Sequence, residues 1–285
     1  MKGIILKNAN YDTPSTVYQA NRLVEELSKL GVEVTVTKND GSLCTLFEGE
    51  FDLDFCVFLD KDFYTAKFLE SKGVRVFNSA DSIRICDDKM TTYLTLLDTG
   101  VDIPKTVAGT FSYLTSAPSA EKVDYLENKL GYPMVVKLNS SSLGAGVYLA
   151  RDRASLIDIL SDVSNKPHHV QEYIANRRGE DVRVILVGGK VVCAMRRHSD
   201  SDFRSNVELG GKAYPIKLSD EYKGVAEVVA KRLDLDYCGV DLLDGDSGAL
   251  VCEVNSNAFF GGIETVTGVN VAKAYAEHIV NSLKR

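Results

Sequence analysis

Residues 239–255 read GVDLLDGDSGALVCEVN. Two apolar runs flank a turn rich in Gly, Asp and Ser, which is the pattern of a β-hairpin. A turn centred on the middle of this segment brings Asp241 to within one residue of the position opposite Glu253. Because side chains alternate between the faces of a strand, Glu253 and Asn255 share a face that Asp241 can join from the partner strand. The other face would carry apolar side chains that can be buried, namely Val240, Leu242, Cys252 and Val254.

The three polar side chains of this hairpin are candidate metal ligands. Two carboxylates held this close repel each other at neutral pH unless a cation lies between them. Oxygen ligands of this kind suit Mg²⁺ that is shared with nucleotide phosphates. The hairpin therefore predicts a metal site formed by Asp241, Glu253 and Asn255. The alternative is a hairpin whose polar face is simply solvated.

A second candidate feature is a lysine on a strand that precedes a loop of small residues. Lys137 ends the run VVK, and residues 140–146 read SSSLGAG. Glycines allow backbone N–H groups to approach phosphate oxygens, and a nearby lysine supplies positive charge. The segment lacks the pattern G-x-x-x-x-G-K-[ST], which excludes the common P-loop. The alternative is a flexible connector.

A third candidate feature is a group of basic and polar residues beside Gly210 and Gly211. Guanidinium groups suit phosphates and carboxylates because their donors form a planar fork. The group therefore indicates an anion site, and the alternative is a solvated surface stretch. Its members are Arg196, Arg197, His198, Arg204, Ser205 and Asn206.

The first third of the chain alternates short apolar runs with helical patterns, which predicts a small parallel sheet with crossover helices. The expected strands are Gly3–Leu6, Val32–Thr37, Phe55–Leu59 and Val74–Phe77, and the expected helices are Ser15–Leu30 and Tyr64–Lys72. No G-x-G-x-x-G follows the first strand, so the phosphate loop of a dinucleotide-binding domain is missing. The last third carries a further hairpin, with Gly188 and Gly189 as its turn.

Composition narrows the class of protein. The chain has 285 residues and a formal net charge of −7, which argues against a surface built for nucleic acid. The apolar run at the amino terminus is too short for a signal peptide, and no stretch approaches the ~20 residues of a membrane helix. We therefore expect a cytoplasmic protein without membrane contact. Six scattered cysteines, with no C-x-x-C pair, indicate reduced core residues.

Eight short motifs in this order resemble the ATP-grasp superfamily, and most closely the RimK-like glutamate ligases, from about residue 80 to the end. They are DK (88–89), VVK (135–137), SSSLGAG (140–146), VQEYI (170–174), DVR (181–183), DFRSN (202–206), GVD (239–241) and EVN (253–255). The resemblance implies an α/β protein: a parallel α/β domain at residues 1–85, then an ATP-grasp fold of two α+β subdomains. These would span residues 86–171, with the Gly/Ser loop, and 172–285, with the metal site.

The resemblance also implies a role for each matching residue. Lys89, Lys137, Gly144 and Gly146 would lie at the ATP phosphates, and the backbone of Glu172, Tyr173 and Ile174 would border the adenine. Asp181 would accept from the ribose hydroxyls, although it could instead be an ion-pair partner of Arg196. Arg204, Ser205 and Asn206 would face the transferring phosphate, with Arg204 and Asn206 as the catalytic pair. Asp241, Glu253 and Asn255 would bind Mg²⁺ or Mn²⁺.

The activity implied is a carboxylate–amine ligase that uses ATP, forms an acyl phosphate and releases ADP and phosphate. Its partners would be ATP and amino-acid or peptide-like carboxylate and amine substrates. After Asn255, residues 256–264 read SNAFFGGIE instead of the small residue, Ser, Pro and Gly usual in that family. Glutamate specificity therefore does not follow from the resemblance. The alternatives are an enzyme that forms a thioester or a phosphorylated product, and a regulatory ATP-binding protein without turnover. The sequence leaves a monomer and a homo-oligomer both open.

Overall fold

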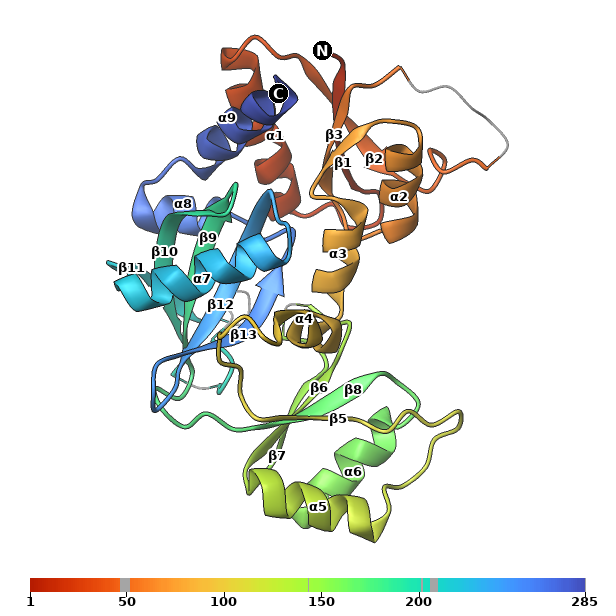
Figure 1. The fold of residues 1–285 in the computed structure, drawn as a ribbon, viewed down its shortest axis with the longest axis vertical. Coiled ribbons are helices and arrows are strands. Elements are labelled where there is room, and N and C mark those ends of the chain that lie inside the picture. Colours follow the sequence, from red (N-terminus) through yellow and green to blue (C-terminus); the bar gives the residue numbers. More distant parts are fainter. Residues whose placement is uncertain (47–51, 143, 201, 206–209, 285) are drawn as a thin grey trace.

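The computed structural model describes residues 1–46, 52–142, 144–200, 202–205 and 210–284, and these form three sheets with helices packed around them (Figure 1). The chain passes through the sheets from the top of Figure 1 to the bottom and returns, so that both termini lie at the same end. Within the described ranges, no helix is long and apolar enough to cross a membrane.

The first sheet is parallel, as predicted, and has helices on both faces. In spatial order its strands are β2 (Val34–Asn39), β1 (Gly3–Asn8), β3 (Phe55–Leu59) and β4 (Arg75–Phe77). Its helices are α1 (Pro14–Lys29), α2 (Phe63–Ser71) and α3 (Ala80–Asp87). Successive residues of β1 enter different cores: Ile5 packs with α1, whereas Leu6 packs with α2 and α3. This two-sided burial explains why the strands are apolar throughout.

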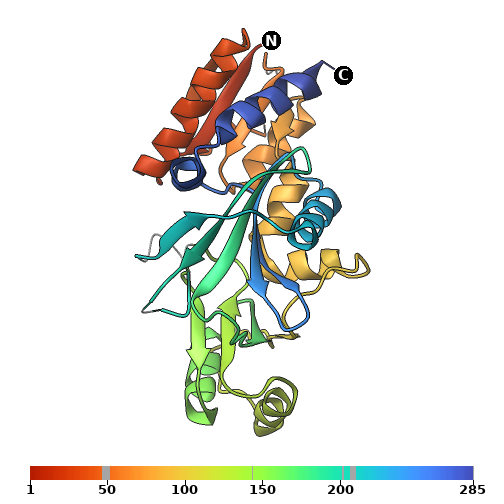
Figure 2. The same ribbon diagram turned by 90° about the vertical axis from the view of Figure 1, so that its left-hand side faces the viewer.

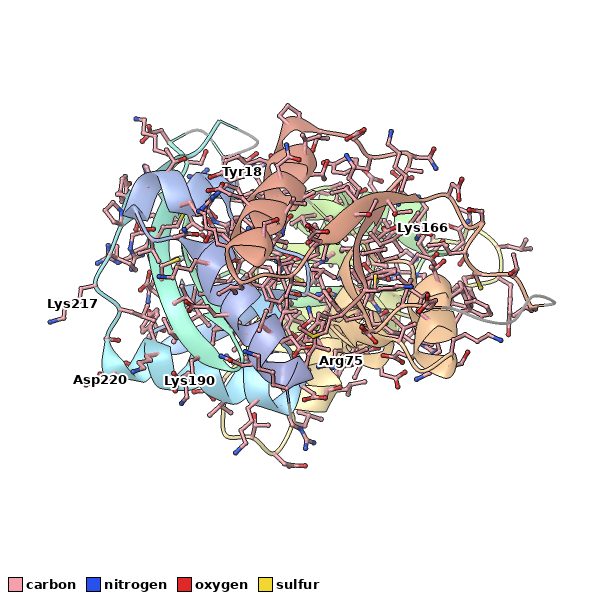
Figure 3. All side chains as sticks on the ribbon, turned by 90° about the horizontal axis from the view of Figure 1, so that it is seen from above. Tyr18, Arg75, Lys166, Lys190, Lys217 and Asp220 are labelled. Atoms are coloured by element: carbon pink, nitrogen blue, oxygen red, sulfur yellow. The ribbon has the colours of Figure 1, made fainter. Side chains whose placement is uncertain are left out.

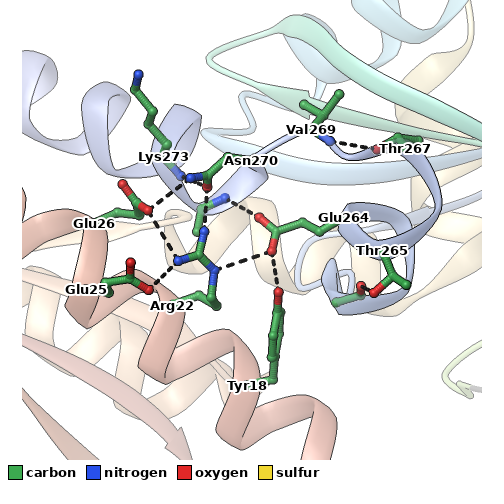
Figure 4. Close-up of polar contacts among 12 residues, drawn as sticks. Tyr18, Arg22, Glu25, Glu26, Glu264, Thr265, Thr267, Val269, Asn270 and Lys273 are labelled. Atoms are coloured by element: carbon green, nitrogen blue, oxygen red, sulfur yellow. Dashed lines mark hydrogen bonds and ion pairs between the residues drawn. The ribbon is translucent and has the colours of Figure 1, made fainter.

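The carboxy-terminal helix α9 (Val271–Leu283) joins α1 on the first sheet. The two helices lie beside each other in Figure 2, and Ile279 of α9 is fully buried in the same core as Leu23 of α1. A ring of polar contacts closes this junction (Figure 4), in which Arg22 reaches Asn270 at 2.9 Å and Glu264 at 3.5 Å. The amino-terminal 85 residues therefore share a core with the end of the chain.

The second sheet is antiparallel and carries the hairpin of residues 239–255. In spatial order its strands are β11 (Lys212–Pro215), β10 (Lys190–His198), β9 (Glu180–Val187), β12 (Tyr237–Asp244) and β13 (Ala249–Asn255). Helix α7 (Asp220–Arg232) packs on one face, and α8 (Gly261–Thr267) and α9 pack on the other. The face under α8 and α9 is apolar at one end, with Ile185 and Met195, and charged at the other, with Arg183 and Arg197. At the charged end, Arg197 and Arg183 line cavities.

The third sheet forms the small module at the bottom of Figure 1. In spatial order its strands are β5 (Thr106–Ala108), β8 (His168–Glu172), β6 (Met134–Leu138) and β7 (Val147–Ala150). Helices α5 (Ala120–Leu130) and α6 (Arg153–Val163) cover one face, where Met134 and Val136 are fully buried. Val135 and Lys137 alternate with them and therefore point to the uncovered face.

The sequence favours a helix over residues 87–97, and α4 (Lys89–Leu96) lies within that segment. It follows directly on α3, which ends at Asp87. Asp88 has an extended backbone and its carboxylate accepts from the N–H of Thr91 at 2.7 Å, so it acts as the N-cap of α4. Helix α4 packs on α7 and β13 of the second sheet.

Two residues labelled in Figure 3, Tyr18 and Arg75, fasten the first module to the second. Tyr18 donates to Glu264 at 2.7 Å, and Arg75 donates to both oxygens of Asp236 at 2.8 and 2.9 Å. Between them, Asn78 donates to the carbonyls of Tyr237 and Ser256 from a buried position. The edge of the first sheet is thereby held against the strands that carry the candidate metal ligands.

Candidate active site

A cavity lies between the charged end of the second sheet and the uncovered face of the third sheet. The structure brings most of the predicted nucleotide-site residues to its wall: Lys89, Lys137, Gly144, Glu172, Tyr173, Ile174, Asp181, Arg204, Ser205, Asp241 and Glu253. Gly146 does not line the cavity, but its carbonyl accepts from the N–H of Leu138 and closes the Gly/Ser loop. Asn206 lies outside the described residues, so its predicted role remains a prediction.

The Gly/Ser loop is anchored from three directions. Lys89 donates to the carbonyl of Ser141 at 2.8 Å, and Lys61 of the first module donates to the hydroxyl of Ser142 at 2.8 Å. Arg204, which follows the second sheet, donates to the carbonyl of Gly144 at 2.8 Å. Three cationic side chains from three parts of the fold therefore surround a loop that the sequence links to phosphate binding.

Asp241 lies in a network of buried charges at the floor of the cavity. It is 3% exposed, and Arg183 donates to its two oxygens at 2.7 and 2.6 Å while Arg197 approaches at 3.0 Å. Burial opposes the charged form of Asp241, but the two guanidinium groups outweigh it and hold the pKa of this carboxyl below its ordinary value. Asp241 is therefore an anion at neutral pH.

The ion-pair partner of Asp181 is Arg197, not the Arg196 that the sequence suggested. In the hairpin of β9 and β10 the pairing starts in the expected register, with Lys190 opposite Val187, but a β-bulge at Val192 moves it by one residue. Asp181 then lies opposite Arg197, whose Nε donates to it at 2.7 Å. Arg196 instead pairs with Asp244 and Glu180.

A second bulge sets the register of the other hairpin. The extra residue is Cys252, and it places Glu253 directly opposite Asp241. Cys252 was expected on the buried apolar face, and this prediction is wrong: its side chain lines the cavity, with its Sγ 3.7 Å from the Nζ of Lys137. Burial raises the pKa of the Cys252 thiol, so it is neutral at pH 7.

Lys137 is 8% exposed and keeps its charge. Burial works against its ammonium group, but the neighbouring acidic groups of Cys252, Tyr93 and Glu253 outweigh this and raise its pKa above the ordinary value. Among the described residues, the Nζ of Lys137 donates to a thiol alone, so this ammonium group can still donate to a ligand. Lys137 therefore presents an available positive charge to the cavity.

The predicted ligand set fits a divalent cation. Glu253 is 28% exposed, and its ion pair with Lys89 is long, at 3.4 Å. Asp241 accepts three hydrogen bonds in all, which leaves about one of a carboxylate's four acceptor positions, on its Oδ1. The described residues contain no group of three His, Cys, Asp or Glu side chains placed for a metal. Asn255 would have to provide the third oxygen.

The end of β8 forms the rim predicted for adenine. The N–H of Glu172 donates to the carbonyl of Lys105 at 3.0 Å, and its carboxylate accepts from the N–H of the same residue at 2.8 Å. The side chain of Glu172 therefore fastens β8 to the segment before β5. Tyr173 lies edge-on to Phe203 with ring centroids 6.3 Å apart, which adds aromatic surface at this rim.

A second cavity, of about 330 Å³, opens on the other side of Glu253. It lies between the first sheet and the metal-site hairpin, and Glu253 lines both cavities. Its other lining residues are Asn8, Tyr11, Thr16, Leu59, Asp60, Lys61, Ser142, Arg183, Asn255, Asn257, Ala258 and Phe259. Segment 256–264 is where the sequence departs from the pattern usual in RimK-like ligases. The structure places Asn257, Ala258 and Phe259 of this segment in the wall of the second cavity.

Sequence reasoning missed part of the site. Arg183 binds Asp241 but was not chosen as a site residue, although it lies in the DVR motif. Arg197 was expected in an anion site, but its contact with Asp241 was not expected. Alternation along β9 could have found Arg183, because it shares a face with Asp181. No family motif includes Asp60, which directly follows an apolar strand.

The family model of the RimK-like ATP-grasp domain matches residues 86–279 of the chain. The chain belongs to the RimK-like ATP-grasp family. It is 36% identical over 227 residues to β-citrylglutamate synthase B of Danio rerio and 35% identical over 227 residues to N-acetylaspartylglutamate synthase A of Homo sapiens. These matches cover 79% of this chain but 55% and 57% of the two relatives, so the chain spans little more than half of their length.

A bacterial relative of more similar extent is a probable α-L-glutamate ligase of Legionella pneumophila, 34% identical over 221 residues that cover 76% of this chain and 71% of the relative. Solved structures confirm the fold. A RimK domain ATP-grasp protein of Sphaerobacter thermophilus superposes with a TM-score of 0.74, at 19% identity and 98% and 99% coverage of the two chains. The D-alanine–D-alanine ligase of Bacillus anthracis gives 0.76, at 20% identity and 100% and 97% coverage.

Proposed function

We propose that this protein is a ligase that joins a carboxylate to an amine at the expense of ATP. The observation that carries the proposal is the position of Glu253, which lies where a cavity rich in cationic side chains meets a second cavity. The first cavity suits nucleotide phosphates because Lys89, Lys137 and Arg204 line it. The second would hold the substrates beside the terminal phosphate.

In the proposed reaction, a carboxylate oxygen attacks the γ-phosphorus of ATP, the bond to the β-phosphate oxygen breaks, and ADP leaves. The amine then attacks the carbonyl carbon of the acyl phosphate, loses a proton and expels phosphate. Such phosphoryl transfer depends mainly on positioning and charge neutralisation. Lys137 and Arg204 would neutralise phosphate charge. Asp241, Glu253 and Asn255 would hold Mg²⁺ or Mn²⁺, which would supply further neutralisation of phosphate charge when bound.

The adenine would lie against the end of β8. The N–H of Glu172 donates to Lys105, and its carbonyl would accept from the adenine amino group. The ribose would meet Asp181, whose carboxylate is held in place by Arg197. Ser205 lines the same cavity, and with Asn206 and Arg204 it would face the transferring phosphate.

Glutamate is our first candidate for the amine. The names of the two synthases and of the bacterial ligase all contain glutamate, linked to N-acetylaspartyl or citryl groups in the synthases. An amino acid or short peptide would supply the carboxylate. We place the enzyme in the cytoplasm, which supplies ATP and keeps thiols reduced, because all six cysteines are free. Its oligomeric state is left to measurement.

The test is ADP release from the purified chain with ATP, Mg²⁺ and a matrix of substrates. The carboxylates would be citrate, N-acetylaspartate and short peptides, and the amines would be the proteinogenic L-amino acids. Release that needs both substrates supports the ligase, and release with no pair would show a binding protein without turnover. Hydroxylamine traps an acyl phosphate as a hydroxamate, so a missing hydroxamate during turnover would favour a kinase.

Lys137→Met should weaken ATP binding by about 10–100-fold, because it removes a charged donor while keeping a side chain of similar length. The measurement is titration with ATP by calorimetry. Glu172→Ala is the matched control on the neighbouring strand: it removes the hydrogen bond to Lys105 and should change the affinity little, since only the backbone of Glu172 is assigned to adenine. A large loss of affinity in a folded Glu172→Ala protein would contradict that assignment.

A further inference from the structure

The second cavity ends on the carboxyl edge of the parallel sheet. Asn8 and Asn39 are the last residues of β1 and β2, and Asp60 directly follows β3. These three strands are neighbours, so their ends meet at one place. Ligands of open α/β sheets bind in the crevice outside the carboxyl ends of the strands. Asn8 and Asp60 line the cavity there.

Asp60 is held in place entirely by neutral donors. Asn8 donates at 3.0 Å and Asn39 at 2.8 Å, and the N–H of Lys61 donates at 2.7 Å. The side chain is 7% exposed. In the part of the chain that the structure describes, no cationic group lies within ion-pair distance of it. Buried carboxylates are normally paired with a cation, because burial disfavours the charge.

The other charged groups of this cavity already have partners. Arg183 is paired with Asp241 at 2.6 Å, and Lys61 with Asp87 at 2.8 Å. Glu253 pairs with Lys89. The negative charge of Asp60 is therefore the one that a ligand would have to balance.

Two further observations show that the cavity is built for an organic ligand. The rings of Tyr11 and Phe259 are stacked, with centroids 6.5 Å apart and planes at 11°, and form an apolar wall. The Nδ2 of Asn255 is buried without a hydrogen-bond partner among the described residues, and Asn255 lines the same cavity. An unpaired buried donor suits a ligand oxygen.

We propose that Asp60 binds the protonated amino group of the amine substrate, which is a small amino acid or similar primary amine. The stacked rings of Tyr11 and Phe259 form the wall for its carbon skeleton, and the Nδ2 of Asn255 donates to its oxygen. Asp60 thus selects the amine and orients it toward Glu253, and the ammonium group gives up one proton to solvent before its nitrogen attacks the acyl phosphate. This inference rests on the proposed ligase function and adds to it the residue that binds the amine.

The test compares Asp60→Asn with wild type in the ADP-release assay, using the amino acid that gives most turnover. Asp60→Asn should raise the KM for the amino acid by about 10–100-fold, since it removes a charged acceptor. The KM for ATP should stay within about twofold. Asp81→Asn is the matched control, because it removes an exposed carboxylate of the same module outside the cavity. An unchanged KM for the amino acid in Asp60→Asn would overturn the inference while leaving the ligase function standing.

A second measurement on the wild-type protein covers the case in which Asp60→Asn does not fold. The deaminated form of the same amino acid, which keeps the carbon skeleton but lacks the ammonium group, is tested as a competitor. Its inhibition constant should exceed the KM of the amino acid by at least about tenfold. Equal values would show that the ammonium group is not bound and would overturn the inference. ADP release in the absence of any amino acid would contradict the proposed ligase function, and with it this inference.

Discussion

Glu253→Gln is expected to lower the Mg²⁺-dependent turnover by at least about 10²–10³-fold, the size of effect seen when one electrostatic contact to the transition state is lost. The side chain keeps its volume and loses its charge. Glu253 is partly exposed and its pair with Lys89 is long, so the free energy of unfolding should change by less than about 1 kcal/mol. The measurement is ADP release over a range of Mg²⁺ concentrations, with thermal unfolding of the same sample. Turnover near the wild-type value would contradict the metal site.

Asp241→Asn separates the proposed role of the metal-site hairpin in turnover from its role in the stability of the fold. It should also abolish turnover, but at a cost in stability, because Asp241 is buried between Arg183 and Arg197. Removing one partner of a buried ion pair typically costs about 3–5 kcal/mol. We therefore expect Glu253→Gln and Asp241→Asn to lose activity equally, and Asp241→Asn to lose more stability. Equal stabilities would show that the arginines do not depend on this carboxylate.

The pH dependence of stability follows from the same contact. The pKa of Asp241 is lowered in the folded state, so the folded protein holds its proton less tightly than the unfolded chain, whose aspartates titrate at about 3.9. The stabilisation is therefore present above about pH 4 and is lost as the pH falls through the lower, folded value. In Asp241→Asn, the free energy of unfolding should therefore depend less on pH below about pH 4, which denaturation at a series of pH values measures.

The strands of the sheets could be predicted because the residues that determine them are neighbours in the sequence. Continuous apolar runs such as Phe55–Leu59 mark strands that are buried on both faces, and residues 188–189 mark a hairpin turn. The register of the hairpins could be predicted only as far as the first bulge. Pairing counted from the turn puts Asp181 opposite Arg196, and the bulge at Val192 replaces this partner with Arg197.

The second cavity could not be predicted, because its walls come from distant parts of the chain. Asp60 and Phe259 meet only when the first sheet docks against the metal-site hairpin. That docking depends on long-range contacts such as Asn78 with Tyr237. Family motifs locate the residues that touch the nucleotide. They carry no information about Asp60, an aspartate at the end of an apolar strand.

Arg204→Ala should lower kcat by about 10²–10³-fold and leave the KM values nearly unchanged. The guanidinium group lies in the cavity wall, where Asp202 holds it at 2.7 Å and its Nη1 donates to Gly144. A donor fixed in this way suits charge that develops on the transferring phosphate, and interactions made only in the transition state affect kcat. The measurement is steady-state kinetics with ATP and the carboxylate varied separately.

Two further variants separate charge from geometry. Arg204→Lys keeps the charge but loses the planar fork, and should recover only part of the activity. Asp202→Asn keeps the arginine and its contact with Gly144 but weakens the support on its other side, so its kcat should fall less than that of Arg204→Ala. If Arg204→Ala raised the KM for the carboxylate and spared kcat, Arg204 would bind the substrate in its ground state, and its proposed role at the transferring phosphate would be wrong.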